Sequence, residues 1–288
     1  MTRILITGCR GQLGRELVER PPPGVELCAL DRASLDITSE ASVTDTICSV
    51  RPDWIVNTAA YTAVDQAEDD REQAFAINQN GPSHLARAAA RVGARLVQVS
   101  TDYVFDGTLG RPARPDDPPR PVNVYGASKH GGENAVLEIL GDRAVVLRTA
   151  WVYSTHGHNF LNSMLRLMAE RESLTIVEDQ IGSPTSTAGL AKVIFSVIQS
   201  DIRGVHHWTD AGVASWFDFA VATHARARSA GLLSRPCHIT PIPSSDFPTR
   251  ARRPLDSRLD KSSLRQALDM PGDAWSDALD QMVARIQK

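Results

Sequence analysis

A short apolar run, a glycine-rich turn and a helical stretch follow one another within the first twenty residues. Arg3 to Thr7 has the composition of a β-strand, Gly8, Gly11 and Gly14 follow it, and a helical pattern covers Arg15 to Arg20. Gly-x-x-Gly-x-x-Gly alone occurs in many loops. Between a strand and a helix, it is typical of the turn that cradles a dinucleotide pyrophosphate. This order of elements constrains the fold first, because it predicts the opening unit of a nucleotide-binding sheet.

Strand-like and helical stretches then alternate through the first half of the chain. The sequence predicts strands at 25–30, 53–57, 95–100 and 143–149, and helices at 39–50, 64–92 (interrupted at 78–82) and 125–140. Residues 107–122, rich in proline, glycine, arginine and aspartate, are predicted to be a surface loop. This alternation predicts an α/β fold with a Rossmann-type, doubly wound parallel sheet.

The alternation loosens after Tyr153. Helices are predicted at 159–171, 186–200, 215–228 and within 264–288, and short strands at 174–177, 204–208 and 239–242. We expect residues 1–150 to form an NAD(P)-binding Rossmann domain. Residues 151–288 are expected to form mainly a smaller C-terminal substrate-binding lobe, with about 186–208 returning to the sheet.

Two residues of opposite charge, Asp31 and Arg32, end the second predicted strand. An acid there can bind the adenosine ribose hydroxyls, whereas an arginine can accommodate a 2′-phosphate, so the choice between NADPH and NADH stays open. Asp36 either faces the adenine or caps the helix that begins near Ser39. The small residues after the third strand, around Ala59 and Ala60, leave room for a ligand at the carboxyl edge of the sheet.

Tyr125 and Lys129 are four residues apart, so on a helix they lie on one face about one turn apart. A nearby ammonium favours the ionised form of a phenol, which predicts a lowered Tyr125 pKa and a tuned proton donor. Thr101 ends the fourth predicted strand, where its hydroxyl can hydrogen-bond a substrate carbonyl. By itself, Tyr-x-x-x-Lys is also a common chance spacing on a surface helix.

Composition and residue spacing give no sign of a nucleic-acid binder, a membrane protein or a metal site. The chain is 42% hydrophobic and 23% charged with a net charge of -3, which does not suggest a nucleic-acid or membrane-surface binder. No apolar run reaches membrane-spanning length, and the four cysteines lack metal-ligand spacing. None of the eight histidines has convincing ligand spacing either, so we expect no metal. We expect a cytoplasmic protein with reduced cysteines and no export signal.

Taken together, these motifs resemble the extended short-chain dehydrogenase/reductases, and within them the dTDP-4-dehydrorhamnose reductase family. The resemblance covers nearly the whole chain. The motifs that carry it are Gly11 to Gly14, Asn57 to Asp65, Ser100 to Phe105, Asn123 to Lys129, Arg148 to Tyr153, Asp179 to Thr185, and Arg253-Pro254 with Ser257-Arg258-Leu259.

The resemblance implies reduction of the 4-keto group of a dTDP-4-keto sugar, dTDP-4-dehydro-β-L-rhamnose, by NADPH or NADH. It makes Tyr125 the proton donor, with Lys129 on the nicotinamide ribose and Thr101 tuning the proton transfer. The cofactor-binding positions are predicted to be Gly8, Gly11, Gln12, Leu13, Gly14, Asp31, Arg32, Asp36, Ile37, Ala59, Ala60, Tyr61, Thr62, Tyr125 and Lys129.

Thr101, Asp102, Trp151 and Arg253 are the predicted substrate-binding residues. The Trp151 indole is expected to cover an apolar sugar or thymine face, although an ordinary core aromatic fits the same pattern. Arg253 belongs to a segment, Phe247 to Pro254, with three arginines among prolines. That segment is either a solvated loop or an anion-binding loop for a nucleotide diphosphate.

The chain departs from the family at one point. Some members are described as dimers bridged by magnesium through glutamates, and Glu16 occupies the first such position. The segment Ser186 to Leu190 has no glutamate, and neither does the carboxyl terminus. A magnesium bridge is therefore doubtful, and we expect a monomer or a metal-free homodimer.

Three alternatives stay open. A sugar-nucleotide dehydratase or epimerase shares the fold, but the dehydratase acid pair is incomplete because Tyr103 follows Asp102. A 4-ketoreductase for a different dTDP-deoxysugar would carry the same catalytic residues. A non-catalytic NADP-binding regulatory subunit would not need Thr101, Tyr125 and Lys129 together.

Overall fold

In the computed structural model, which describes residues 1–286, six strands form one parallel sheet in the order β10-β5-β4-β3-β1-β2. The strands are β1 (Thr2–Thr7), β2 (Val25–Leu30), β3 (Trp54–Asn57), β4 (Arg95–Thr101), β5 (Ala144–Thr149) and β10 (Gly204–His207). The predicted doubly wound parallel sheet is confirmed. The strand order changes direction at β1, because β2 lies on one side of it and β3 on the other. The glycine turn that follows β1 therefore lies at the switch point where such sheets bind ligands.

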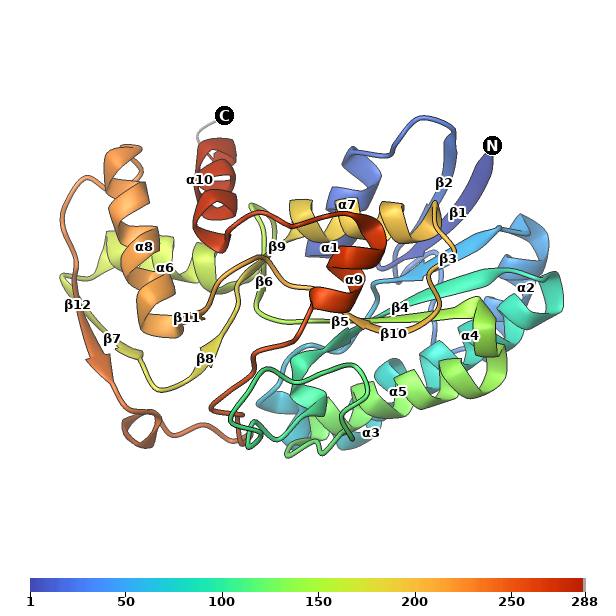
Figure 1. Cartoon of the computed structure of the whole chain (residues 1–288), viewed down its shortest axis with the longest axis horizontal. Helices are drawn as coiled ribbons and strands as arrows, with labels where there is room; N and C mark the ends of the chain where they lie inside the picture. Colours follow the sequence, from blue (N-terminus) through green and yellow to red (C-terminus); the bar gives the residue numbers. More distant parts are fainter. Residues whose placement is uncertain (287–288) are drawn as a thin grey trace.

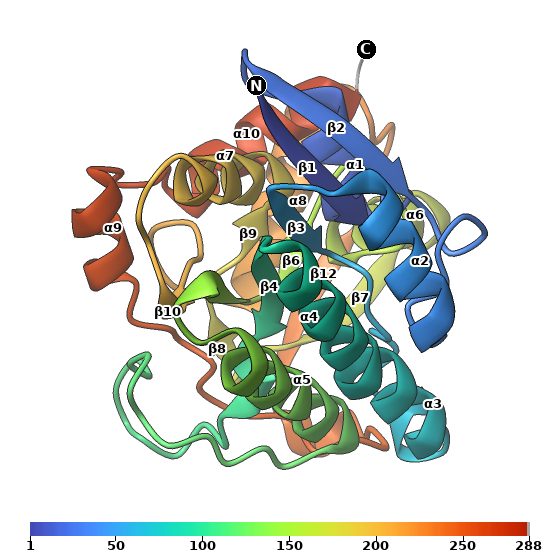
Figure 2. The ribbon, with the colours of Figure 1, turned by 90° about the vertical axis from the view of Figure 1, so that its right-hand side faces the viewer.

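Helices cover both faces of this sheet (Figures 1 and 2). Successive residues of β1 point to opposite faces, so Ile4 and Ile6 pack into one core and Leu5 into the other. The first core is closed by α1 (Gln12–Glu19) and α7 (Thr187–Ile198). The second is closed by α2 (Glu40–Val50), α4 (Gly81–Val92) and α5 (Val124–Leu140).

The remaining elements build a smaller lobe on the left of Figure 1. It contains α6 (Phe160–Glu170), α8 (Trp216–Ser229) and α10 (Trp275–Ile286), with β7 (Ser173–Val177) paired in parallel to β12 (His238–Ile242). Two further two-stranded pairs are β6 (Val152–Tyr153) with β9 (Thr185–Ser186), and β8 (Ile181–Gly182) with β11 (Ala214–Ser215). The chain visits the sheet once more through α7 and β10, and α9 (Ser262–Leu268) packs beside β10.

Single-turn helices complete the chain: η1 (Gln66–Glu68), η3 (Asp102–Val104), η4 (Gly141–Arg143) and η5 (Ser244–Asp246), with α3 (Arg71–Phe75) and the π-helical turn η2 (Ala76–Asn80). The predicted interruption near Asn78 is thus a wider helical turn and not a break. Pro82 causes no break because it lies in the first turn of α4, where its missing N–H is not needed.

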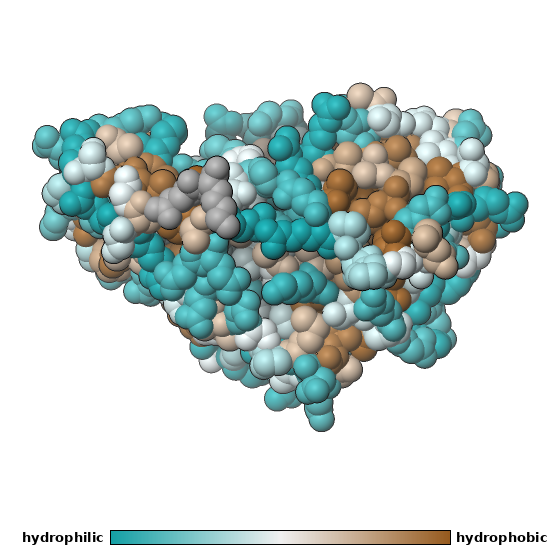
Figure 3. Space-filling model, turned by 90° about the horizontal axis from the view of Figure 1, so that it is seen from above, coloured by the Kyte–Doolittle hydropathy of each residue, from teal (hydrophilic) through white to brown (hydrophobic). Residues whose placement is uncertain are grey.

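Hydrophilic and hydrophobic residues intermingle on the face seen from above in Figure 3. Within residues 1–286, no helix combines the length and the apolar character needed to cross a membrane.

Candidate active site

The glycine turn is shaped to bring a ligand close to the backbone. Gly8 has a φ of 66°, and a Cβ at this position would lie 2.8 Å from the Ala59 nitrogen, so a larger residue would close the turn. Gly11 then precedes α1, and no side chain caps that helix, so its first N–H groups are available to an anion. These features fit a dinucleotide pyrophosphate.

A cavity of about 290 Å³ lies beside this turn. Eight of the predicted cofactor residues line it: Gly8, Gly11, Asp31, Arg32, Asp36, Ile37, Ala59 and Ala60. Leu13 packs instead into the core under α1, and Gln12 accepts a hydrogen bond of 2.9 Å from Asn159 of the smaller lobe. The assignment of all these residues to cofactor binding stays a prediction.

Arg10 is a third charged residue beside Asp31 and Arg32, the two that follow β2. Its Nε lies 2.7 Å from Asp31 Oδ2, and it lines the same cavity as Arg32. The Ser34 side chain and backbone donate to Asp31 Oδ1, and these hydrogen bonds lower the Asp31 pKa. Sequence reasoning missed Arg10, although its place between Gly8 and Gly11 was a usable signal.

Asp36 does not cap α2. Its Oδ1 accepts hydrogen bonds from the Thr38 nitrogen and hydroxyl at 2.9 and 2.8 Å, which lower its pKa. The helix is capped by Ser39, whose hydroxyl accepts from the Ser42 nitrogen. Of the two roles considered for Asp36, the helix cap is therefore wrong, because the Asp36 carboxylate stabilises its own turn at the cavity wall.

The catalytic candidates meet where β4 ends against the start of α5. Asn123 caps α5 by accepting from the Gly126 nitrogen at 2.7 Å. A Cβ at Gly126 would lie 2.1 Å from the Tyr103 carbonyl oxygen, so glycine allows α5 to approach the segment after β4. Tyr125 thereby comes within hydrogen-bonding reach of the Thr101 hydroxyl. The structure thus brings Thr101 and Tyr125 together.

Burial dominates the electrostatics of this pair. It raises the pKa of Tyr125 to about 12, and the hydrogen bond with Thr101 offsets only part of that rise. Lys129 is also buried, its Nζ donates to the Val99 carbonyl at 2.6 Å, and burial lowers its pKa to about 8. The predicted lowering of the Tyr125 pKa by Lys129 is wrong in this structure, because desolvation of the phenol dominates and Lys129 is not among the charges that shift its pKa.

Asp102 lies next to this pair. Thr101 Oγ1 donates to its Oδ1 at 3.0 Å, whereas Oδ2 is buried without a hydrogen-bond partner among the described residues. Burial raises the pKa of Asp102 to about 7, and the Ser257 hydroxyl and Thr101 partly counter this. The carboxyl therefore changes its charge near neutral pH beside the phenol of Tyr125.

A second cavity, of about 830 Å³, opens in the smaller lobe. Aliphatic side chains of α6 and β7 line it together with Tyr103, Phe160, Gln180, Trp216 and Arg253. Among the predicted substrate residues, Arg253 belongs to this lining, whereas Thr101, Asp102 and Trp151 do not.

Trp151 lies outside the cavity lining and stacks on Trp216, which lines it. The two indoles are 3.6 Å apart between centroids, with 8° between their planes. The Trp151 backbone has a φ of 49°, a conformation rare for a bulky residue. The indole at the cavity wall is thus Trp216, which sequence reasoning missed because nothing near it in the sequence marks a site. Tyr103 was also missed as a lining residue.

The family is decided by comparison with known proteins. A model of the RmlD substrate binding domain matches residues 1–288. The chain belongs to the dTDP-4-dehydrorhamnose reductase family. A family member from Aggregatibacter actinomycetemcomitans is 39% identical over 287 residues, which cover 97% of each chain.

Two other relatives bear on cofactor and substrate. A crystal structure of dTDP-4-dehydrorhamnose reductase from Bacillus anthracis, in complex with NADP, superposes with a TM-score of 0.93 at 36% identity, covering 99% of this chain and 100% of that one. A dTDP-4-keto-6-deoxy-D-glucose reductase from Streptomyces niveus is 40% identical over 280 residues, covering 97% and 96% of the two chains.

Glu16, the family position linked to magnesium, is buried and paired with an arginine in this reductase-family chain. Its Oε1 accepts from Arg285 Nη1 at 3.0 Å, and its Oε2 lies 2.9 Å from Arg285 Nη2. Thr187 and Arg20 lie at 3.4 and 3.5 Å from the same carboxylate. Within residues 1–286, no group of three or more His, Cys, Asp or Glu residues is placed to hold a metal ion.

The arginine-rich segment Phe247 to Pro254 is held by two acidic residues of the turn after β3, Asp65 and Asp69. Arg253 Nη2 donates to Asp65 Oδ2 at 2.6 Å, and Arg250 forms an ion pair with Asp69. Asn123, the cap of α5, donates to the Arg252 carbonyl at 2.8 Å. The segment is therefore anchored by ion pairs and contributes Phe247 and Arg253 to the cavity wall, although much of it stays exposed to solvent. Its role as an anion-binding loop stays a prediction.

Proposed function

We propose that this protein reduces the 4-keto group of dTDP-4-dehydro-β-L-rhamnose to give dTDP-β-L-rhamnose, using NADPH or NADH. The observation that carries the proposal is the meeting of Thr101 and Tyr125 at the end of β4, with Lys129 one turn farther along α5. Family membership and the NADP complex of the Bacillus anthracis relative support it.

The cofactor would lie on the glycine turn, along the cavity lined by Asp31, Arg32 and Asp36. When bound, it supplies the hydride that reduces the ketone carbon. Arg10 and Arg32 offer charge to a 2′-phosphate, and Asp31 offers an acceptor to ribose hydroxyls, so these residues serve either form of the cofactor.

Tyr125 donates its phenolic proton to the carbonyl oxygen as negative charge develops there. A pKa of about 12 keeps the phenol protonated at neutral pH, and an alkoxide is a stronger base than a phenolate, so the transfer runs downhill. Thr101 orients the carbonyl through its hydroxyl, whose single proton, donated to Asp102 Oδ1 in this structure, would turn to the carbonyl oxygen. The Lys129 ammonium has three N–H donors, and one of them is used in the hydrogen bond to the Val99 carbonyl. The remaining donors would bind the hydroxyls of the nicotinamide ribose.

A coupled assay tests the proposal. dTDP-glucose is converted by a dehydratase and an epimerase to the 4-keto sugar, and absorbance of the reduced nicotinamide is followed after this protein is added. We expect oxidation of NADPH with dTDP-rhamnose as the product. Cofactor binding without oxidation would overturn the proposed reaction.

A 4-ketoreductase for a different dTDP-deoxysugar is the second candidate, and the Streptomyces niveus relative favours it. Both candidates use the same catalytic residues, so the assay separates them by the keto sugar that is consumed. A protein that reduces no keto sugar but binds a stoichiometric protein partner would instead be a regulatory subunit.

We infer that the protein works in the cytoplasm as a monomer or a metal-free homodimer. The four cysteines are free thiols, as expected in a reducing compartment. The Glu16 carboxylate is already neutralised by Arg285, which leaves it poorly suited to bridge a magnesium ion to a second subunit.

A further inference from the structure

An acidic turn, residues 65–70, contacts three functional segments of the molecule. Glu68 accepts a hydrogen bond of 2.8 Å from the Val124 nitrogen, at the start of the helix that carries Tyr125. Asp70 accepts from the Tyr61 hydroxyl at 3.0 Å, in the predicted cofactor segment. Asp65 contacts the arginine-rich segment. The turn therefore joins the catalytic helix, the cofactor segment and the wall of the larger cavity.

Asp65 holds that wall by two separate bonds. One carboxylate oxygen accepts from Arg253 Nη2 at 2.6 Å, and the other accepts from the Ala251 backbone nitrogen at 3.1 Å. The same side chain thus fixes the guanidinium and the backbone two residues before it. Arginine side chains are otherwise mobile, and a fixed guanidinium loses less freedom when it binds an anion.

Arg253 keeps donors for a ligand while it holds Asp65. It lines the 830 Å³ cavity, and its side chain is 24% exposed. A guanidinium has five N–H donors, of which the hydrogen bond to Asp65 occupies one. The others suit the paired oxygens of a diphosphate.

We propose that Asp65 is a positioning residue that holds Arg253 toward the diphosphate of the nucleotide-sugar substrate. This inference rests on the proposed function only for the class of ligand, a nucleoside diphosphate. The negative charge of Asp65 also repels a diphosphate. The proposal therefore predicts that the affinity gained by orienting the Arg253 guanidinium exceeds the affinity lost to this repulsion.

The chain offers a matched control. Asp69 forms an ion pair with Arg250 in the same two segments, but Arg250 is 70% exposed and lies outside the cavity lining. Exposed ion pairs contribute little to stability, so neither Asp65→Asn nor Asp69→Asn should unfold the protein. Both substitutions remove one negative charge, and only Asp65→Asn releases a cavity residue.

The experiment is calorimetric titration of the full chain with dTDP and with thymidine, without cofactor. We expect Asp65→Asn to weaken dTDP binding about tenfold, the scale of one charged hydrogen bond, and to leave thymidine binding unchanged. Asp69→Asn should bind both ligands as the parent does. Arg253→Gln should show the same selective loss, and the double variant Asp65→Asn/Arg253→Gln should lose no more.

Unchanged or tighter dTDP binding by Asp65→Asn would overturn the proposal, because the carboxylate would then be neutral or a competitor of the diphosphate. An equal loss with thymidine, or no dTDP binding by the parent, would overturn it too. The titration requires no hydride transfer. A protein that binds dTDP as expected but reduces no keto sugar would refute the proposed function alone.

Discussion

At the residue scale, the proposed reaction depends most directly on one phenolic proton. Tyr125→Phe removes it while keeping the ring that packs edge-on against Tyr103. We expect turnover to fall at least about a hundredfold, the usual scale for loss of a general acid, with cofactor affinity retained. Stopped-flow turnover and fluorescence titration with NADPH measure the two quantities. Retention of full turnover would remove Tyr125 from the mechanism.

Asp102 provides a pH prediction at the same scale. Its pKa of about 7 means that the carboxyl is neutral below that pH and ionised above it, and the ionised form raises the Tyr125 pKa. A weaker acid transfers its proton more slowly, so kcat/KM for keto-sugar reduction should fall, by about threefold or more, as the pH rises from about 6 to about 8.

The test compares pH profiles of variants. Asp102→Asn cannot ionise and should lack this fall, whereas Asp106→Asn should keep it, because hydrogen bonds from Thr108 hold the Asp106 pKa below its usual range. A profile for Asp102→Asn that coincides with the parent profile would contradict the assignment.

The limits of sequence reasoning are clearest at single residues. The spacing of Tyr125 and Lys129 correctly placed both on one helix, but spacing says nothing about burial, and burial sets both pKa values. Trp216 reaches the cavity through a lobe assembled from distant segments, so no local pattern marked it. The Asp65 to Arg253 contact joins residues 188 positions apart.

At the scale of elements, a buried ion pair fastens α5 to β5. Arg148 of β5 donates to both oxygens of Glu133 on α5 at 2.9 and 2.8 Å, and both side chains are almost fully buried. Glu133 follows Lys129 by one helical turn. The pair therefore helps fix the helix that carries Tyr125 and Lys129.

Removing one partner should be costly, because it leaves the other charge buried without compensation. We expect Arg148→Met to lower the free energy of unfolding by about 3–5 kcal/mol, and Arg148→Met/Glu133→Gln to recover part of that loss. Arg203→Met is the control, since it breaks an exposed pair with Asp201 and should cost about 1 kcal/mol or less. Urea unfolding measures all three. Equal losses in Arg148→Met and Arg203→Met would show that burial adds nothing here.

Long elements were readable from the sequence because their signals are local. The strand Val25–Leu30 and the helix Val124–Leu140 lie where apolar runs and the turn residues before them predicted them. The two-residue strands β8, β9 and β11 carry no such signal, because their pairing depends on segments brought together by the fold. The π-helical turn at Ala76–Asn80 was read as an interruption. In the structure, Asn78 there forms hydrogen bonds with Tyr61 and Ser128, which ties the predicted cofactor segment to α5.

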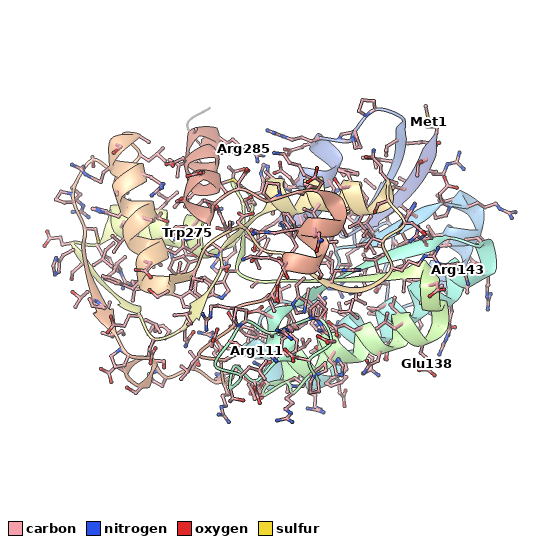
Figure 4. All side chains as sticks on the ribbon, in the orientation of Figure 1. Met1, Arg111, Glu138, Arg143, Trp275 and Arg285 are labelled. Atoms are coloured by element: carbon pink, nitrogen blue, oxygen red, sulfur yellow. The ribbon has the colours of Figure 1, made fainter. Side chains whose placement is uncertain are left out.

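At the scale of the whole molecule, the two ends of the chain are joined through Glu16. Arg285 on α10, labelled in Figure 4, belongs to the last helix, and Glu16 belongs to α1 beside the glycine turn. Their ion pair links the smaller lobe to the half of the molecule that contains the six-stranded sheet. Because the carboxylate is buried, a magnesium ion would have to displace Arg285 and carry its own ligands and waters into that space.

The mass in solution should therefore be independent of magnesium. We expect light scattering to give the same mass in MgCl₂ and in EDTA, whether that mass is of a monomer or a dimer. Arg285→Ala sharpens the test, because it leaves Glu16 paired with Arg20 at the longer distance of 3.5 Å. If the variant gains a magnesium-dependent dimer and the parent does not, Arg285 is what keeps the metal out. If the parent itself loses half its mass on chelation, the ion pair yields to magnesium, and the metal-free assembly proposed for this chain is wrong.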